Sequence, residues 1–204
     1  MNGRSPASPH SITPPLLVWL LIQLISLGFS CGRARISAGL PVAAESWALQ
    51  QLLIVQIVSA GMLFPFLLRD LLVTIVMIVT SICFLQLATF LSGFGQREVW
   101  LCWSYLALWL TALASWRRAL APRQRCVAVA IVNVLTIGLP ALQYLRGEFH
   151  DAGKWGLVAL SPTWAALSDP IALRPHFWVE IGIMAIAGLA LGLWRQDRQD
   201  EDAR

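Results

Sequence analysis

Charged side chains are scarce in this sequence. Asp, Glu, Lys and Arg make up 13% of its 204 residues, against roughly a quarter in a typical soluble domain. Hydrophobic residues make up 57%, and the mean hydropathy is +0.67. A chain of this composition has too little polar surface to cover a water-soluble globule. The composition therefore excludes an ordinary soluble domain and indicates a single compact unit that lies almost wholly in or beside a lipid bilayer.

Lysine is nearly absent, because all but one of the 15 basic residues are arginine. The formal net charge is +4, but the arginines are spread through short segments between apolar runs. That distribution is typical of membrane-topology signals. No basic helix or RNA-binding signature accompanies it. The sequence therefore predicts no nucleic-acid partner.

Signatures of catalysis and of cofactor binding are missing as well. The chain has no phosphate-binding loop, no H-E-x-x-H and no G-x-S-x-G. No histidine falls inside an apolar run, which excludes haem held by two histidines within the bilayer. The four cysteines form no close pair and have no histidine at zinc-ligand spacing. We predict no catalytic residue, no cofactor and no metal site.

What the sequence does contain is a series of six apolar runs, each close to the ~20 residues that a membrane-spanning helix needs. The predicted fold class is all-α, a polytopic integral membrane protein with six transmembrane helices in one domain, residues 16–194. The predicted spans are 16–29, 47–68, 71–91, 99–116, 126–145 and 177–194. Pro65 is expected to end or kink the second span, so that residues 65–70 form the turn to the third.

The first run is the shortest, and two interpretations remain open for it. Residues 16–29 form a retained helix, or Arg4 and the apolar stretch belong to a signal peptide whose cleavage leaves five spans. Pro14 and Pro15 directly before the run, and the absence of a clean Ala-x-Ala site after it, favour retention. Residues 1–15 then form a disordered leader, and residues 195–204 form a polar tail.

The basic residues predict the orientation of the spans. The connection between the fourth and fifth spans holds four arginines and no acidic residue: Arg117, Arg118, Arg123 and Arg125. Arginine-rich connections lie on the cytoplasmic side. Six spans then place both termini in the cytoplasm, and we expect a multi-pass protein of the inner membrane.

The connection from 146 to 176 lies on the opposite side in this topology. It includes an apolar stretch, 155–167, that is too short to span a bilayer. The sequence therefore predicts a short re-entrant or interfacial helix before the last span.

Charge is absent from the predicted spans apart from Glu180, one turn inside the sixth. Proton relays, ion-coupled carriers and voltage sensors place ionisable groups at membrane depth, so these classes are not favoured. Neutral polar residues do occur there, notably Gln56, Gln86 and Asn133. Together with Glu180, they either line a path for a polar substrate or hold helices together.

Small residues recur along the sixth span at Gly182, Gly188 and Gly192. Such spacing permits close approach of two helices. We expect a helix–helix interface here, within the chain or in a homodimer.

The predicted topology resembles the permease subunit of type-II ABC exporters. The resemblance rests on six spans with both termini inside and on an outer loop before the last span that contains Leu160-Ser161-Pro162 and Ala165-Ala166-Leu167. It implies a dimeric channel that is energised by a separate ATPase subunit. The family's docking helix between the second and third spans is replaced here by little more than Arg69-Asp70. Arg117, Arg118, Arg123 and Arg125 are therefore the predicted contact to that partner.

Two functions remain open from the sequence. The first is a membrane transport subunit that acts with an ATPase. The second is a non-transporting scaffold or accessory subunit of a larger membrane complex, in which packing satisfies every polar residue.

Overall fold

A computed structural model describes residues 13–36, 47–68, 71–92, 95–150, 161–163, 182–183, 185–186 and 190. Every regular element in these residues is helical. The elements are α1 (Thr13–Ile36), α2 (Trp47–Leu67), α3 (Leu71–Ser92), α4 (Gln96–Ala119), α5 (Pro122–Asn133), the π-helical turn η3 (Val134–Gly138) and α6 (Leu139–His150).

Four helical segments are long and apolar enough to cross a membrane: Leu49–Leu67, Leu71–Phe90, Gln96–Ala119 and Arg123–Arg146. They correspond to the second to fifth predicted spans. In α1 the apolar part, Pro14–Ser30, has 17 residues and is shorter than these four. Most of the predicted sixth span, and nearly all of the loop 146–176 beyond α6, lie outside the described residues. The all-helical, membrane-like architecture is thus confirmed, while the count of six spans and the re-entrant helix stay predictions.

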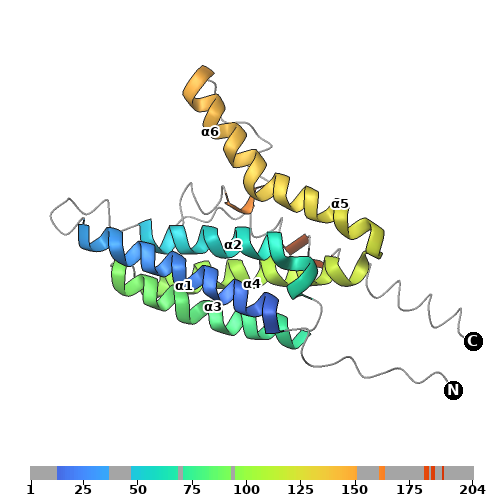
Figure 1. Ribbon diagram of the computed structural model, residues 1–204, viewed down its shortest axis with the longest axis horizontal. Coiled ribbons are helices and arrows are strands. Elements are labelled where there is room, and N and C mark those ends of the chain that lie inside the picture. The colour runs from blue at the N-terminus through green and yellow to red at the C-terminus, as the bar shows by residue number, and fades with distance from the viewer. Residues whose placement is uncertain are drawn as a thin grey trace, which may run out of the picture.

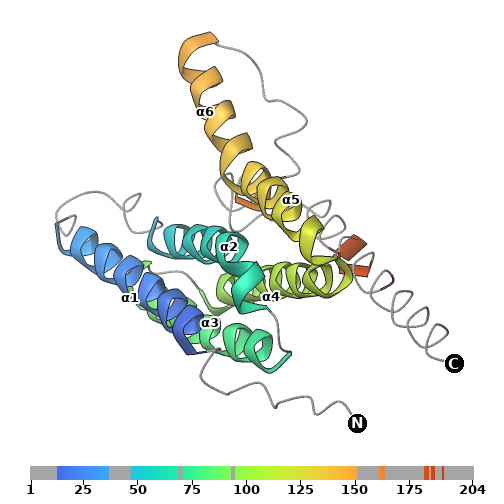
Figure 2. The same cartoon turned by 45° about the vertical axis from the view of Figure 1, so that its right-hand side comes forward.

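Helices α1 to α4 lie side by side as an up-and-down bundle (Figures 1 and 2). The start of α1, the end of α2, the start of α3 and the α4–α5 connection share one end of this bundle in both views. Its interior is filled by large side chains from all four helices, among them Trp19, Phe64, Met77 and Tyr105. Helix α5 folds back against α2, and α6 leaves the bundle (Figure 1).

The bundle carries apolar side chains on its outside. Phe29, Phe66, Leu72 and Phe90 are between 68% and 85% exposed, whereas the amide side chains of Gln23 and Gln56 are fully buried. Each of the helices α1 to α6 exposes large apolar side chains. The distribution suits a hydrocarbon solvent, in which apolar groups face outward and polar groups seek partners inside.

Tryptophans of α4 fix that helix against two neighbours. The indole N–H of Trp103 donates to the carbonyl of Ile78 in α3 at 2.8 Å, and that of Trp109 donates to the carbonyl of Ile57 in α2 at 3.4 Å. A buried indole N–H needs a partner. These two bonds set how α4 lies between α2 and α3.

Helix α2 continues through Pro65 to Leu67, so the predicted turn at 65–70 is shorter than expected. Pro65 has no N–H to donate to the carbonyl four residues earlier, so one hydrogen bond of α2 is missing near its end. The last carbonyls of a helix have no partner inside the helix. One of these carbonyls, that of Pro65, accepts a hydrogen bond of 2.9 Å from Nε of Arg117. The end of α2 is therefore held by the end of α4.

The connection between α4 and α5 is tight. Leu120 and Ala121 are extended, and Pro122 begins α5 in the position where its missing N–H costs nothing. Oε1 of Gln124 accepts a hydrogen bond from the backbone N–H of Ala121 at 3.0 Å, and Nε of Arg125 donates to the carbonyl of Leu120 at 3.3 Å. Alanine has no side-chain acceptor, so this cap is formed from the Gln124 side alone.

Residues 122–150 form one helical rod that is interrupted by η3. Figures 1 and 2 show α6 leaving at an angle to α5. A π turn adds a residue to one helical turn, and Pro140, just beyond it, has no N–H to give to the ladder. Both features lie where the rod bends.

Candidate functional site

The residues that could act chemically inside the bundle gather between α1 and α2. We call Gln23, Ser26, Gln56 and Ser59 the α1–α2 seam. Gln23 and Ser26 lie three residues apart on α1, as do Gln56 and Ser59 on α2. Residues three or four apart share a helix face. All four side chains are at most 5% exposed.

One hydrogen bond joins the two helices across the seam. Nε2 of Gln23 donates to Oγ of Ser59 at 3.1 Å, and Oγ of Ser59 donates to the backbone carbonyl of Gln56 at 3.3 Å. Since α1 and α2 run in opposite directions (Figures 1 and 2), pairing of 23 with 59 places Ser26 at the level of Gln56. The bond between Gln23 and Ser59 thus joins the helices, while Ser26 and the Gln56 amide lie at the next level without a bond between them.

Several polar atoms of the seam have no hydrogen-bond partner among the described residues. They are Oε1 of Gln23, Oγ of Ser26, and both Oε1 and Nε2 of Gln56. A buried polar group without a partner costs about 1 to 3 kcal/mol. Gln56 is the extreme case, because its side chain is fully buried and neither end of the amide is bonded.

The electrostatics of the seam are neutral. From 13 to 30 and from 49 to 67, α1 and α2 contain no Asp, Glu, Lys or Arg. The amides and hydroxyls can both donate and accept hydrogen bonds. The unpaired donors and acceptors of the seam suit a neutral polar group or water, whereas its own residues offer no group that relays a proton or holds an ion by charge.

The other polar residues that the sequence singled out lie apart from the seam. Gln86 exchanges two hydrogen bonds with Gln96, of 2.9 and 3.1 Å, and so joins α3 to the start of α4. Nδ2 of Asn133 donates to the carbonyl of Val129 at 2.9 Å, at the point where the π turn begins. Glu180 lies outside the described residues.

Most serine and threonine hydroxyls of α3 and α4 donate a hydrogen bond to a backbone carbonyl of their own helix. Thr80, Thr89, Thr111 and Ser115 each donate to the carbonyl four residues earlier, at 2.7 to 2.8 Å. Such bonds satisfy the hydroxyl without any contact to another helix. Among the described residues, four buried polar atoms without a partner belong to three residues of the seam, and others belong to Trp19, Asn133 and Thr163.

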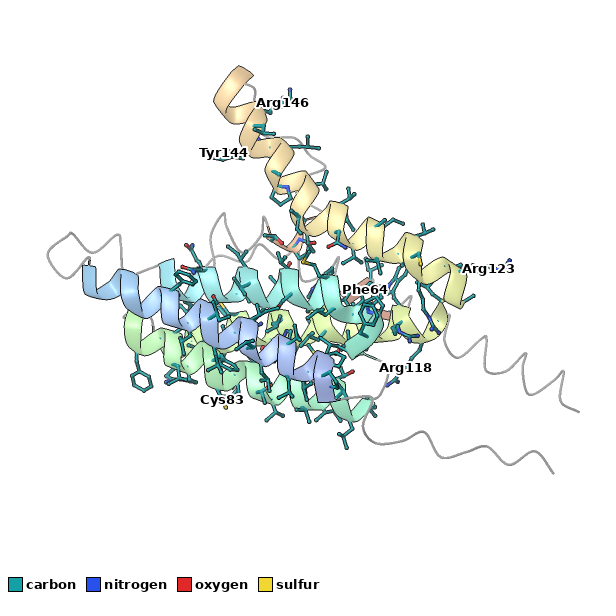
Figure 3. All side chains as sticks on the ribbon, viewed as in Figure 1. Phe64, Cys83, Arg118, Arg123, Tyr144 and Arg146 are labelled. Carbon is teal, nitrogen blue, oxygen red and sulfur yellow. The ribbon has the colours of Figure 1, made fainter. Side chains whose placement is uncertain are left out.

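The four arginines of the α4–α5 connection fall into two pairs. Arg117 and Arg125 are half-buried and bond backbone carbonyls of Pro65 and Leu120. Arg118 and Arg123 are exposed. Figure 3 shows both exposed side chains at the same end of the bundle, pointing in different directions. The predicted set of four equivalent contact residues is therefore divided, with two arginines also serving the fold.

This division predicts a difference in stability between two neighbouring arginines. Arg117→Ala leaves the end of α2 without its donor, and we expect the free energy of unfolding to fall by about 1 to 2 kcal/mol. Arg118→Ala removes an equal charge from an exposed position and should change it by less than about 0.5 kcal/mol. Thermal unfolding of both variants in the same detergent measures the difference. Equal losses would show that the bond to Pro65 contributes nothing.

A close helix approach lies at a glycine that the sequence did not single out. A Cβ at Gly61 in α2 would lie 3.0 Å from Cγ1 of Val132 and 3.7 Å from Cγ2 of Thr136. A Cβ at Gly182 would meet nothing within 4 Å, and Gly188 and Gly192 lie outside the described residues. The run Ser59-Ala60-Gly61 was the available signal, since small residues allow helices to approach closely.

An apolar pocket lies between α2, α4 and α5, with a volume of about 360 Å³. Its walls include Phe64, Trp109, Trp116, Val127, Ala128 and Ile131. Among the residues that line it, Gln124 has the only side-chain amide, and none is charged. Pockets for small ligands commonly measure ~300 to 1,000 Å³. Sequence reasoning missed this pocket, because it depends on how three helices that are distant in sequence come together.

No protein-family model, curated protein or solved structure matches this chain. Its function is therefore inferred from the geometry of the seam, the arginines and the pocket.

Proposed function

We propose that this chain is a membrane-embedded transport subunit, similar to the permease of an ABC exporter, that works with a separate ATPase. The observation that carries the proposal is the amide of Gln56, which is fully buried and unpaired among the described residues. A polar path through an apolar bundle has to offer hydrogen bonds that its own packing leaves open.

The cost of the seam supports this function. A leucine at position 56 would remove a buried amide at no loss of any side-chain hydrogen bond that the described residues make. An unpaired buried amide lowers stability by about 1 to 3 kcal/mol. Its presence is explained if the amide forms its hydrogen bonds with a passing substrate group or with water. In this proposal the seam is the part of the domain that meets a neutral polar group.

The proposed topology has six spans, with both termini in the cytoplasm of a cell with an inner membrane. Helix α1 begins, α2 ends and α4 passes into α5 at the same end of the bundle. This arrangement supports the proposed topology, because every second connection of a chain that crosses the membrane repeatedly lies on the same side. That end carries Arg117, Arg118, Arg123 and Arg125, and arginine-rich connections stay cytoplasmic.

Energy for transport would come from a partner, because these 204 residues contain no phosphate-binding loop. We assign the partner contact to Arg118. Its side chain is exposed at the end of the bundle, on α4, and it points away from α5 (Figure 3). A protein that docks across this end of the bundle would meet it.

Purification of the full chain in mild detergent, followed by mass spectrometry of what accompanies it, tests this proposal. We expect an ATPase to co-purify with the wild type and with Arg97→Glu, which reverses an exposed charge at the opposite end of the bundle. We expect Arg118→Glu to lose it. Recovery of no ATPase with the wild type would contradict the proposal.

One observation favours the rival function of a non-transporting accessory subunit. Outside the seam, most described hydroxyls and amides of the spans are satisfied by packing, as the reciprocal bonds between Gln86 and Gln96 illustrate. The two functions differ at Gln56, because only transport requires the unpaired amide.

A further inference from the structure

The pocket between α2, α4 and α5 is long and follows the helix axes. Along α5 and the start of η3 its lining runs from Gln124 to Leu135, and along α4 and the residue after it from Trp109 to Leu120. At a rise of 1.5 Å per residue, each range covers about 17 Å. The hydrocarbon of one bilayer leaflet is about 15 Å deep, half of the ~30 Å core. The pocket thus has the depth of one leaflet.

The pocket is also accessible from the side. Val127 and Ile131 line it, yet they are 60% and 54% exposed. Side chains that both line a pocket and reach the outer surface mark an opening between them. A molecule in the surrounding bilayer could enter here without crossing the bundle.

Positive charge lies at one end of the pocket only. Arg123 and Arg125 flank Gln124, the lining residue nearest the start of α5. Arg123 also precedes Val127 by one helical turn, so that it lies above the side opening. No acidic residue occurs between 117 and 125. The deep end, around Trp109 and Leu135, contains no charged residue.

We propose that this pocket binds an anionic phospholipid, with an acyl chain between α2, α4 and α5 and its phosphate at Arg123 and Arg125. An apolar slot of leaflet depth that is capped by cationic groups matches the two parts of such a lipid. Arg125 uses Nε for the carbonyl of Leu120, but a guanidinium has five N–H donors, so one bond does not exhaust it. This proposal does not depend on transport.

Two tryptophans in the pocket wall, Trp109 and Trp116, provide the readout. The full chain is reconstituted in phosphatidylcholine vesicles that contain equal fractions of either dibrominated phosphatidylglycerol or dibrominated phosphatidylcholine. Bromine quenches tryptophan fluorescence on contact. Subtracting the signal of a Trp109→Phe, Trp116→Phe double variant isolates the pocket from the other tryptophans.

We expect brominated phosphatidylglycerol to quench the pocket tryptophans at a lower mole fraction than brominated phosphatidylcholine. Arg123→Gln and Arg125→Gln should each weaken this preference about fivefold, since a cation near the headgroups contributes on the order of 1 kcal/mol. Arg118→Gln is the matched control. It removes an arginine from the same hairpin, but its side chain extends from α4 in another direction (Figure 3), and the preference should remain.

A second variant tests the acyl chain separately. Ala128 is 8% exposed and lines the pocket, so Ala128→Phe fills the slot while every arginine remains. We expect it to abolish the preferential quenching, with unchanged incorporation of the protein into the vesicles.

Four outcomes would overturn the proposal. Equal quenching by both lipids would show that no anionic headgroup is recognised. Equal loss in Arg118→Gln would show a general attraction of charge. Undiminished preference in Ala128→Phe would place the lipid outside the pocket. No quenching by either lipid would show that protein, such as the apolar segment 177–194 of this chain or a docked subunit, fills the pocket instead.

Discussion

Replacing Gln56 by leucine is expected to make the protein more stable and to abolish its function. The substitution removes two buried polar atoms that have no partner among the described residues, and it keeps a side chain of similar size. Relief of that desolvation should raise the free energy of unfolding by about 1 to 3 kcal/mol. If the amide meets the substrate, the same change removes the hydrogen bonds that the substrate needs.

Thermal unfolding in detergent measures the first effect, and complementation of a strain that lacks the chain measures the second. Gln86→Leu is the matched control, because it makes the same substitution at an amide that is already hydrogen-bonded to the amide of Gln96. It should lower stability slightly and leave complementation intact. Full complementation by Gln56→Leu would favour the accessory-subunit function over transport.

The second large effect is expected at Gly61. The Cβ of a leucine at this position would lie 3.0 Å from Cγ1 of Val132, and the rest of its side chain would overlap with α5. Overpacking of this kind typically costs about 1 to 3 kcal/mol in other cores. We expect Gly61→Leu to separate α5 from α2, with a lower unfolding temperature and a lower yield of monodisperse protein.

Gly28→Leu provides the control for this substitution. A Cβ at Gly28 in α1 would meet nothing within 4 Å, and the residue is exposed. The added side chain should therefore extend into lipid or detergent without loss of stability. Similar behaviour of the two variants would mean that the close approach at Gly61 does not hold α5 in place.

Hydropathy predicted the helices of the bundle well, but the ends of only some of them. The second and third predicted spans agree with α2 and α3 to within a residue. Helix α4 runs from Gln96 to Ala119 rather than from 99 to 116, because Arg97, Glu98, Arg117 and Arg118 are helical without being apolar. The bend at η3 was not predicted either, since a π turn leaves the hydropathy of residues 126–145 unchanged; Pro140 was its only sign in the sequence.

The contacts that define the site depend on pairs of residues far apart in the chain. Gln56 could be selected from the sequence as a polar residue at depth, but its place in the seam follows from the pairing of Gln23 with Ser59, 36 residues away. Arg117 was assigned to a partner protein because of its charge, and its bond to a carbonyl 52 residues away could not be predicted from the sequence. A hydropathy profile contains no information about which faces of two helices meet.

The unequal lengths of the helices have a consequence for the membrane itself. The apolar part of α1, 17 residues, extends about 26 Å, which is shorter than a bilayer core of ~30 Å. In the proposed six-span topology, lipids beside α1 would have to compress or tilt by about 4 Å, at a cost of fractions of a kcal/mol per Å. The bilayer would thus be thinner beside α1 than around the other helices, and the protein would be more stable in thinner membranes.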